Sequence, residues 1–374
     1  TIENIDAVMR DMAIDEPTVW LKATQNIDNI IDFISALIEK GKAYAAGNGD
    51  VYFDVTSFKG YGCLSNRTVE DMLDGVRVDN CEEKRNPADV ALWKAAKEGE
   101  ISWASPWGNG RPGWHIECSA MNRAAFGEQI DIHGGGRDLI FPHHENEIAQ
   151  TESLTGKRFV QYWTHNGLIK VNGQKMSKSL GNSLLLEDLL KKYTNEAIKF
   201  ALLQTNYRND INITDNLFPD AERHLTEFYR IICAVESKYG AGGKGNAEID
   251  GRFDECMDDD FNTALALSDL FGLFKKISAK LAAGDKSCAD DVAQIKRTFS
   301  LLGLFKKDAA AYLEEVKAKS GGGGIPEEVA ELAEKRWQAK KDKNWAEADA
   351  LRARLSELGY NVKDGKDGYE ITKI

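Results

Sequence analysis

The apolar positions near the start of the chain follow two different periods. Between residues 27 and 38 they recur every three or four residues, which is the spacing of one helix face. Over residues 42–55 apolar and polar positions alternate around Asn48-Gly49 instead. The first pattern predicts a helix over 27–38, and the second predicts a β-hairpin that turns at Asn48-Gly49.

From residue 113 onward, helical and extended patterns alternate. The predicted elements are a helix over 116–126, a strand over 129–133, a glycine turn over 134–136, a helix over 142–154 and a strand over 159–168. Strands joined by helices form parallel crossover units, so this α/β segment is expected to be the second half of a doubly wound, Rossmann-like parallel sheet. The preceding residues 61–112 show no regular period, and loops are expected there.

Beyond residue 182 the pattern becomes helical, which indicates an all-α bundle. Five helices are expected, around residues 184–193, 196–203, 215–239, 260–283 and 290–304. A glycine run then marks a flexible linker. After it come two helices, the second starting near Asn344 with a capping box to Glu347, and a short hairpin.

These patterns divide the chain into five parts. They are an inserted connective subdomain over 1–112, half of a Rossmann-like domain over 113–182, a helical bundle over 183–318, a linker over 319–326 and a small α+β module over 327–374.

Composition narrows the class of protein only slightly. The 374 residues are 42% hydrophobic and 29% charged, as in a globular protein with a sizeable core. The net charge of -12 argues against indiscriminate nucleic-acid binding but allows a local basic face. Because no apolar run can span a bilayer and no signal-peptide order appears, a cytoplasmic location is predicted. The six scattered cysteines are expected to be reduced thiols.

Five of the six histidines lie between residues 113 and 182. His143 and Glu147 are four residues apart in a predicted helix, so both project from one face, and Cys118 lies on the preceding crossover unit. A thiolate, an imidazole and a carboxylate form an acceptable zinc set with a position left for substrate. The alternative is a buried cysteine beside a helix-surface ion pair, and spacing alone does not choose between the two.

Two further motifs are suited to a nucleotide. Lys175-Met176-Ser177-Lys178-Ser179 offers two cations and two hydroxyls between glycines, which suits a polyphosphate, although a solvated basic loop has the same composition. Gly134, Gly135 and Gly136 at a strand end allow a nucleotide close to the backbone, and Asp138 can accept a ribose hydroxyl.

Several motifs together resemble one family. Lys175-Met176-Ser177-Lys178-Ser179 matches the second signature, KMSKS, of class I aminoacyl-tRNA synthetases. The segments that resemble the cysteinyl-tRNA synthetase family specifically are Gly113 to Met121, Asp131 to Gly136, Phe141 to Glu147, Gly49 to Val55, Met257 to Thr263 and Asn344 to Asp349. The resemblance extends over essentially the whole chain.

The resemblance implies a function that the patterns alone do not give. ATP, with Mg²⁺, and L-cysteine would form cysteinyl-adenylate, and the cysteinyl group would pass to the 3′ end of tRNA(Cys). Cys118, His143 and Glu147 match zinc ligands, and the zinc would bind the substrate's sulfur.

The resemblance also assigns roles to residues outside the zinc set. Trp114 matches the residue that closes the amino-acid pocket, with His115 beside it as a further catalytic candidate. Lys178, with Lys175, would contact ATP. The helices and stem-contact segment over 183–318 would face the tRNA stem, and the last module would read the anticodon. Its candidate RNA contacts are Arg336, Trp345 and Arg352.

The sequence departs from the family at its N-terminal side. The family's His-Ile-Gly-His motif and a fourth zinc ligand, a cysteine, do not occur, since no cysteine precedes Cys63. We therefore expect an N-terminal half-sheet to be missing, and we expect the chain alone not to catalyse adenylation. Two other functions stay open: a ligase that joins cysteine to a small sugar amine, and a non-catalytic zinc- or RNA-binding remnant. A monomer is the working expectation for the oligomeric state.

Overall fold

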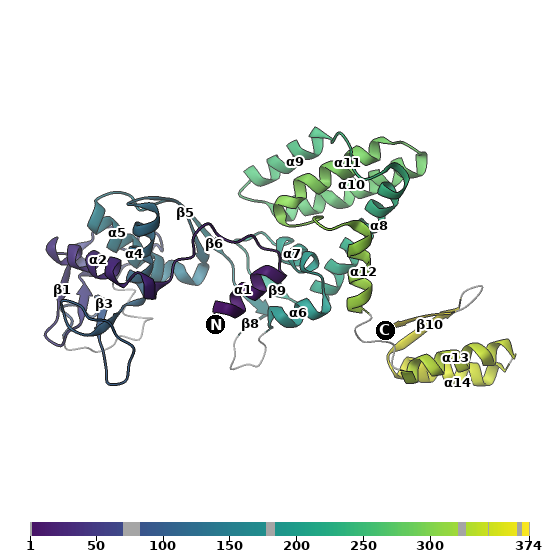
Figure 1. The fold of residues 1–374 in the computed structure, drawn as a ribbon, viewed down its shortest axis with the longest axis horizontal. Coiled ribbons are helices and arrows are strands. Elements are labelled where there is room, and N and C mark those ends of the chain that lie inside the picture. Colours follow the sequence, from purple (N-terminus) through teal and green to yellow (C-terminus); the bar gives the residue numbers. More distant parts are fainter. Residues whose placement is uncertain are drawn as a thin grey trace. The chain divides into compact units, whose positions relative to one another are not determined.

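A computed structural model of the chain describes residues 2–69, 83–176, 184–320, 327–342, 344–364 and 369–373 (Figure 1). Contacts between residues divide the chain into two compact units. One unit contains Glu16–Met176 and Thr205–Ile213, and the other contains Thr1–Asp15, Ser177–Gln204 and Thr214–Ile374.

A four-stranded antiparallel sheet forms the first part of the unit that begins at Glu16. Its strands are β1 (Ala43–Ala45), β2 (Val51–Phe53), β3 (Val90–Ala95) and β4 (Gly110–Pro112), in that spatial order. Helix α2 (Ile27–Glu39) packs against the sheet, and both bury their apolar side chains in one core. The predicted helix and hairpin are confirmed, whereas β3 and β4 lie in the region where loops were expected.

A parallel pair of strands follows in the same unit. Helix α4 (Trp114–Phe126) leads into β5 (Ile130–Gly136), and α5 (Glu145–Thr155) connects β5 to β6 (Val160–Asn166). The two strands pair in parallel, so the predicted crossover unit is confirmed. The predicted glycine turn is wrong, because residues 134–136 extend β5 and pair with residues 164–166 of β6.

A three-stranded sheet completes this unit. Strand β7 (Ile169–Val171) pairs with β8 (Gln174–Lys175) on one side and with β9 (Ile211–Ile213) on the other. Asn172 and Gly173 both have positive φ angles, 49° and 80°, in the turn between β7 and β8. This turn brings Lys175 back antiparallel to Lys170.

Helices dominate the second unit. They are α1 (Ile2–Asp11), α6 (Leu186–Lys192), α7 (Asn195–Leu203), α8 (Leu217–Tyr239), α9 (Ala247–Asp258), α10 (Thr263–Ala283), α11 (Ser287–Phe299) and α12 (Ala309–Ser320). Phe228 and Phe274 stack in the core of the bundle, 4.3 Å apart between ring centroids, and the ring of Phe305 packs against both at a tilt. The predicted bundle is confirmed, and α1, α9 and α12 are additional to it.

The last segment is a small α+β module. It consists of α13 (Glu327–Lys341), α14 (Trp345–Glu357) and the antiparallel hairpin of β10 (Tyr360–Asp364) and β11 (Tyr369–Lys373). Val329, Leu355 and Val362 lie in its apolar core. The predicted cap is confirmed, because Asn344 accepts from the Glu347 amide and donates to the Glu347 carboxylate.

Within the ranges that the structure describes, every helix is too short or too polar to cross a membrane.

Candidate metal and substrate site

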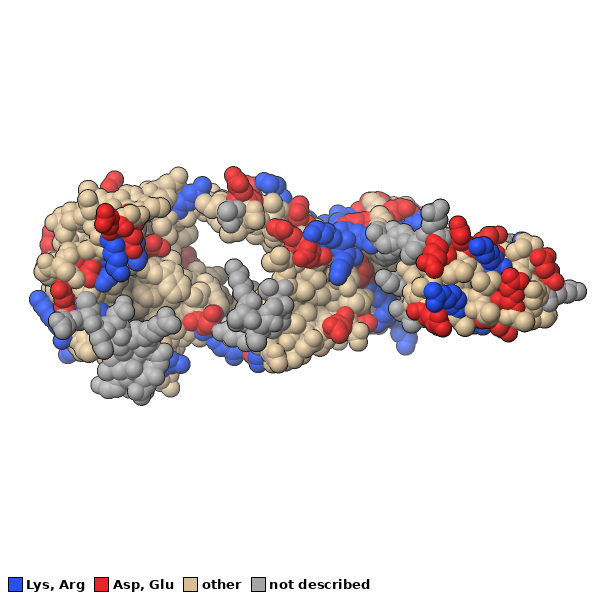
Figure 2. All heavy atoms as spheres, turned by 90° about the horizontal axis from the view of Figure 1, so that it is seen from below, with Lys and Arg blue, Asp and Glu red and all other residues tan. Residues whose placement is uncertain are grey.

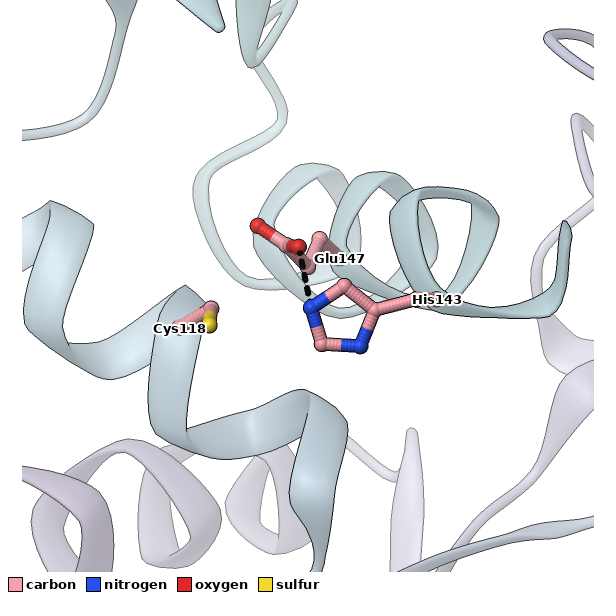
Figure 3. A group of neighbouring side chains, drawn as sticks. All are labelled: Cys118, His143 and Glu147. Carbon is pink, nitrogen blue, oxygen red and sulfur yellow. Dashed lines mark ion pairs between the residues drawn. The ribbon is translucent and has the colours of Figure 1, made fainter. Parts of the chain in front are cut away.

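Two helices bring the predicted metal ligands together. Cys118 projects from α4, while His143 lies in the π-helical turn (Ile140–His144) that runs into α5, which carries Glu147. One ligand atom from each of the three lies within 4.8 Å of the others. Figure 3 shows the Cys118 thiol on one helix facing the imidazole and carboxylate on the other. The spacing argument from the sequence therefore corresponds to a real cluster.

The carboxylate of Glu147 is completely buried, yet one of its oxygens has no donor. Nε2 of His143 lies 3.0 Å from Oε1 of Glu147, but the geometry is not that of an N–H···O hydrogen bond. Among the described residues nothing else donates to Oε1. A buried, unsatisfied carboxylate is costly, so an imidazole nitrogen and a carboxylate oxygen aimed at one point suit a shared cation.

The second nitrogen of His143 is held by another histidine. Nδ1 of His143 lies 2.8 Å from Nδ1 of His115, so one ring donates to the other and Nε2 of His143 remains directed at Glu147. Metal-binding imidazoles are usually oriented in this way by a partner on their other nitrogen. Burial, and then the neighbouring His143, lowers the pKa of His115 to about 3, so His115 is a neutral partner.

Cys118 is a poor thiolate in the absence of a cation. Burial, and then the carboxylates of Glu147 and Glu117, together raise the pKa of its thiol to about 12. A coordinated metal ion reverses this balance, because a thiol that binds a metal ion is deprotonated. Sulfur, nitrogen and oxygen from these three residues thus fit zinc, and they leave a fourth tetrahedral position open.

Three more histidines lie beside this cluster. His144 Nδ1 is 2.8 Å from Nε2 of His165, and the rings of His133, His144 and His165 pack against Trp163. Burial lowers the pKa of all three imidazoles, that of His144 to about 3. His133, His144 and Glu147 form a second group with metal-binding geometry that was not predicted.

Trp114 is positioned at the mouth of the site. Its side chain is 60% exposed, and its ring lies 4.5 Å from that of His143 and 5.3 Å from that of His115. Gly113 precedes it because a side chain there would meet the carbonyl oxygen of Ala91 at 2.0 Å. An exposed indole that stacks on His115 and lies beside the His143 ring can cover a small molecule held at the cluster.

The residues predicted to bind ATP lie at the ends of strands in the same unit. Gly134, Gly135 and Gly136 end β5, and a Cβ on Gly135 would come within 2.7 Å of the His144 ring. Asp138 follows in an exposed turn, and Lys175 ends β8. Lys178 lies outside the described residues.

Asn122 was missed by sequence reasoning. It lies one helical turn after Cys118 on α4, and its Nδ2 donates to Oε2 of Glu147 at 3.4 Å. An amide is not a usual zinc ligand, so the search for ligands passed over it. The four-residue spacing from Cys118 was the signal that could have found it.

The predicted RNA contacts are placed differently from one another. Arg336 is only 3% exposed, and its guanidinium donates to both oxygens of Asp364 at 2.7 and 2.9 Å. Trp345 is 59% exposed, and Arg352 is also on the surface. Figure 2 shows basic and acidic side chains interspersed over the face of this module that it displays. Arg354 and Glu357 form one ion pair of the module, at 2.9 Å.

Three family profiles match the chain. The "tRNA synthetases class I (C) catalytic domain" matches residues 1–223, and the "DALR domain" matches residues 252–306. The "Cysteinyl-tRNA ligase anticodon binding domain" matches residues 322–371.

Two similar proteins are both named cysteine–tRNA ligase. The cysteine–tRNA ligase of Syntrophotalea carbinolica is 43% identical and covers 98% of this chain, which spans 79% of that protein. The cysteine–tRNA ligase of Chromohalobacter salexigens is 45% identical, and the match covers 93% of this chain and 74% of that protein.

A solved structure shows the same fold at low identity. Mycobacterium tuberculosis methionyl-tRNA synthetase, in complex with methionyl-adenylate, matches with a TM-score of 0.53 and 13% identity. The match covers 86% of this chain and 78% of that one, which places the chain among proteins with a class I synthetase fold. From the catalytic profile, the anticodon-domain profile and its relatives, the chain belongs to the cysteinyl-tRNA ligase family of class I tRNA synthetases.

Proposed function

We propose that this protein activates L-cysteine with ATP and transfers the cysteinyl group to tRNA(Cys). The proposal rests above all on the cluster of Cys118, His143 and Glu147, in which a buried carboxylate oxygen has no donor among the described residues. Relatives named cysteine–tRNA ligase support the same reaction.

The metal cluster would recognise the substrate by its sulfur. Zinc bound there would supply a soft Lewis acid that takes a thiolate much more readily than a hydroxyl. Such a preference separates cysteine from serine without a second, editing site. Trp114 would cover the bound amino acid, and His115 would hold the His143 ring in its orientation.

ATP would lie along the end of β5 and against the KMSKS loop. Gly134, Gly135 and Gly136 leave the backbone open to a nucleotide, and Asp138 offers a carboxylate to a ribose hydroxyl. Lys175 and Lys178 would balance negative charge as pyrophosphate departs with its Mg²⁺. The carboxylate of cysteine attacks the α-phosphorus, so the reaction needs no side-chain nucleophile.

The C-terminal half would bind tRNA. We propose the boundaries given above: catalytic half-sheet over 113–182, stem-facing helices over 183–318 and anticodon module over 327–374. Trp345 and Arg352 are the RNA contacts of the last module, since the guanidinium of Arg336 already holds Asp364. A role in protein synthesis places the protein in the cytoplasm, and a monomer is sufficient for it.

The test separates activation from transfer. Because this sequence lacks the family's His-Ile-Gly-His motif, the exchange assay is run on the protein joined to a segment that carries that motif. In that protein, cysteine-dependent exchange of pyrophosphate into ATP reports the first step, and Lys178→Ala should slow it while leaving cysteine binding nearly unchanged. Deleting the residues after Ser320 should preserve exchange and damage the charging of tRNA. Exchange unaffected by Lys178→Ala would remove that lysine from the mechanism. Charging unaffected by the deletion would favour a ligase that acts on a small amine.

A further inference from the structure

One carboxylate belongs to both groups with metal-binding geometry. Glu147 completes the set of Cys118 and His143, and it also completes the set of His133 and His144. Its two oxygens face different partners: Oε1 lies 3.0 Å from Nε2 of His143, and Oε2 lies 3.7 Å from Nε2 of His133. The same side chain can therefore hold a cation at either of two neighbouring positions.

Charge disfavours filling both positions at once. Two divalent ions carry four positive charges, and the two sets offer only the Cys118 thiolate and the Glu147 carboxylate against them. With Cys118 as a thiolate, the first set carries two negative charges and neutralises one divalent ion. The set with His133 and His144 carries only the charge of Glu147. Charge favours the first position, but imidazole, imidazole and carboxylate are still a competent zinc set.

The second position lies on the other side of the carboxylate. Nε2 of His133 is 3.7 Å from Oε2 of Glu147, which is too far for a hydrogen bond and close enough for both atoms to bind one ion. A metal ion that entered on this side would use His133 and His144 without the thiol. It would then occupy the place next to Trp163 rather than the place facing Cys118.

Asn122 lies where it can settle this competition. It is four residues after Cys118, so both side chains project from the same face of α4 toward Glu147. Its amide donates to Oε2, the oxygen that faces His133, while Oε1 has no donor. We propose that Asn122 is a positioning residue that occupies Oε2 of Glu147 and so commits the carboxylate to the position shared with Cys118 and His143.

This inference rests on the proposed zinc site. It predicts a change in which residues bind the metal, in addition to a loss of affinity. An amide N–H beside Oε2 uses that oxygen's lone pair and places a partial positive charge where a second-position ion would sit. Loss of the amide should therefore lower affinity at the first position by roughly 10-fold or more, as loss of an outer-shell partner does. It should also let part of the metal bind without the thiolate.

Cobalt(II) reports both effects, because a cobalt–thiolate bond gives a charge-transfer band that imidazole and carboxylate ligands do not give. The full chain and Asn122→Ala are freed of metal, titrated with Co²⁺ and measured for absorbance and for bound cobalt. We expect the charge-transfer absorbance per bound cobalt to fall in Asn122→Ala. An unchanged ratio would overturn the proposal, even if affinity falls, because it would show only a loss of local packing.

A second variant keeps the test independent of folding defects. In N122A/H133F the competing set is removed, so the absorbance per bound cobalt should return to that of the unmodified chain. A ratio that stays low would also overturn the proposal. Gln129→Ala is the matched control, because Gln129 donates its amide to the Arg158 carbonyl on an exposed surface of the same unit.

A different experimental result would contradict the proposed zinc site itself. If the unmodified chain binds cobalt without any charge-transfer band, the zinc site at Cys118 is wrong, and the role of Asn122 falls with it. If the unmodified chain shows the band and Asn122→Ala shows the same ratio, only the role of Asn122 is wrong.

Discussion

Two glutamates in this protein are buried to nearly the same extent, but they differ in the hydrogen-bond donors that surround their carboxylates. Glu196 on α7 is 2% exposed and accepts from the Tyr229 hydroxyl at 2.7 Å and from the amides of Phe305 and Lys306 at 2.8 and 3.1 Å. Glu147 on α5 is 0% exposed and has a single amide donor, at 3.4 Å, with nothing among the described residues donating to Oε1.

The difference supports a structural role for Glu196 and the proposed ligand role for Glu147. Donors surround the charge of Glu196, so its negative charge is stabilised by the fold and ties α7, α8 and the segment before α12 together. Glu147 instead lies beside an imidazole nitrogen and a thiol, and a cation bound among them would supply the stabilisation that the missing donors do not. Burial alone does not point to a metal ligand; a missing donor beside other potential ligand atoms does.

The largest effect should come from Glu147→Gln. Loss of an outer-shell partner costs metalloproteins about 10–100-fold in affinity, so loss of a ligand should cost roughly 100-fold or more. Zinc content, measured by atomic absorption after dialysis, should drop from one per chain to a small fraction. Cys118→Ser should act in the same direction, because a hydroxyl is a far weaker zinc ligand than a thiolate.

Glu196→Gln is the matched control for that result. This variant should keep its zinc, since Glu196 belongs to the other compact unit. Equal zinc loss in both variants would mean that Glu147 acts through folding rather than through coordination.

The second effect is on the free energy of unfolding. Here Glu196→Gln should have the larger effect and Glu147→Gln the smaller, the reverse of their effects on zinc content. Glu196→Gln points an amide group at backbone N–H donors and should lower the free energy of unfolding by about 3 kcal/mol. In the metal-free chain Glu147→Gln should change it little, because the carboxylate it removes is poorly satisfied. Urea unfolding, with hydrogen exchange to locate the loss in α7 and α8, measures both. A larger loss for Glu147→Gln would contradict the comparison.

Features set by neighbouring residues could be predicted from the sequence more readily than features set by residues far apart in the chain. The turn at Asn48-Gly49 and the cap at Asn344 are local signals, and both appear in the structure. Strand β3 was missed because Leu92 and Trp93 are adjacent and both completely buried, so the strand lacks the alternation that identifies one.

The candidate site residues also differ in whether the sequence alone could identify their surroundings. Cys118, His143 and Glu147 were selected because their chemistry suits one metal, and the structure brings them together. Arg336 was selected as an RNA contact from the resemblance of the last module to the family's anticodon domain, but its partner Asp364 lies 28 residues away and no local pattern pairs them. Ligand chemistry can be read from a sequence, whereas a long-range ion pair cannot.

The third prediction concerns the ion pair of Arg336 and Asp364, in which a buried guanidinium is paired with a carboxylate. The hydrogen bond from Arg336, with that from Lys340, holds the pKa of Asp364 well below its usual value. Asp364→Asn leaves the buried Arg336 without a charged partner and should cost about 2 kcal/mol in the C-terminal module. Hydrogen exchange of α13 and α14 in the full chain measures the loss.

The pH dependence of the same pair has a definite sign. A carboxyl whose pKa is lower in the folded state stabilises the fold above its unfolded pKa of about 3.9, and loses that contribution as pH falls toward the folded pKa. Protection of α13 should therefore decrease as pH is lowered below about 4, and the decrease should be smaller in Asp364→Asn. Parallel decreases in both proteins would contradict the assigned role.

The smallest effect should come from Tyr229→Phe, which removes one donor from Glu196 and leaves the two backbone amides in place. The loss of one hydrogen bond to a carboxylate that keeps two others should lower the free energy of unfolding by about 1 kcal/mol, less than Glu196→Gln does. The stacking of Tyr229 on Tyr312, 3.8 Å apart between ring centroids, is retained by phenylalanine, so the change isolates the hydroxyl. In Glu196→Gln the same substitution should cost much less, because the charge that the hydroxyl stabilises is gone. A double-mutant cycle with no coupling between the two would show that the hydroxyl does not stabilise the Glu196 carboxylate, and would weaken the contrast with Glu147.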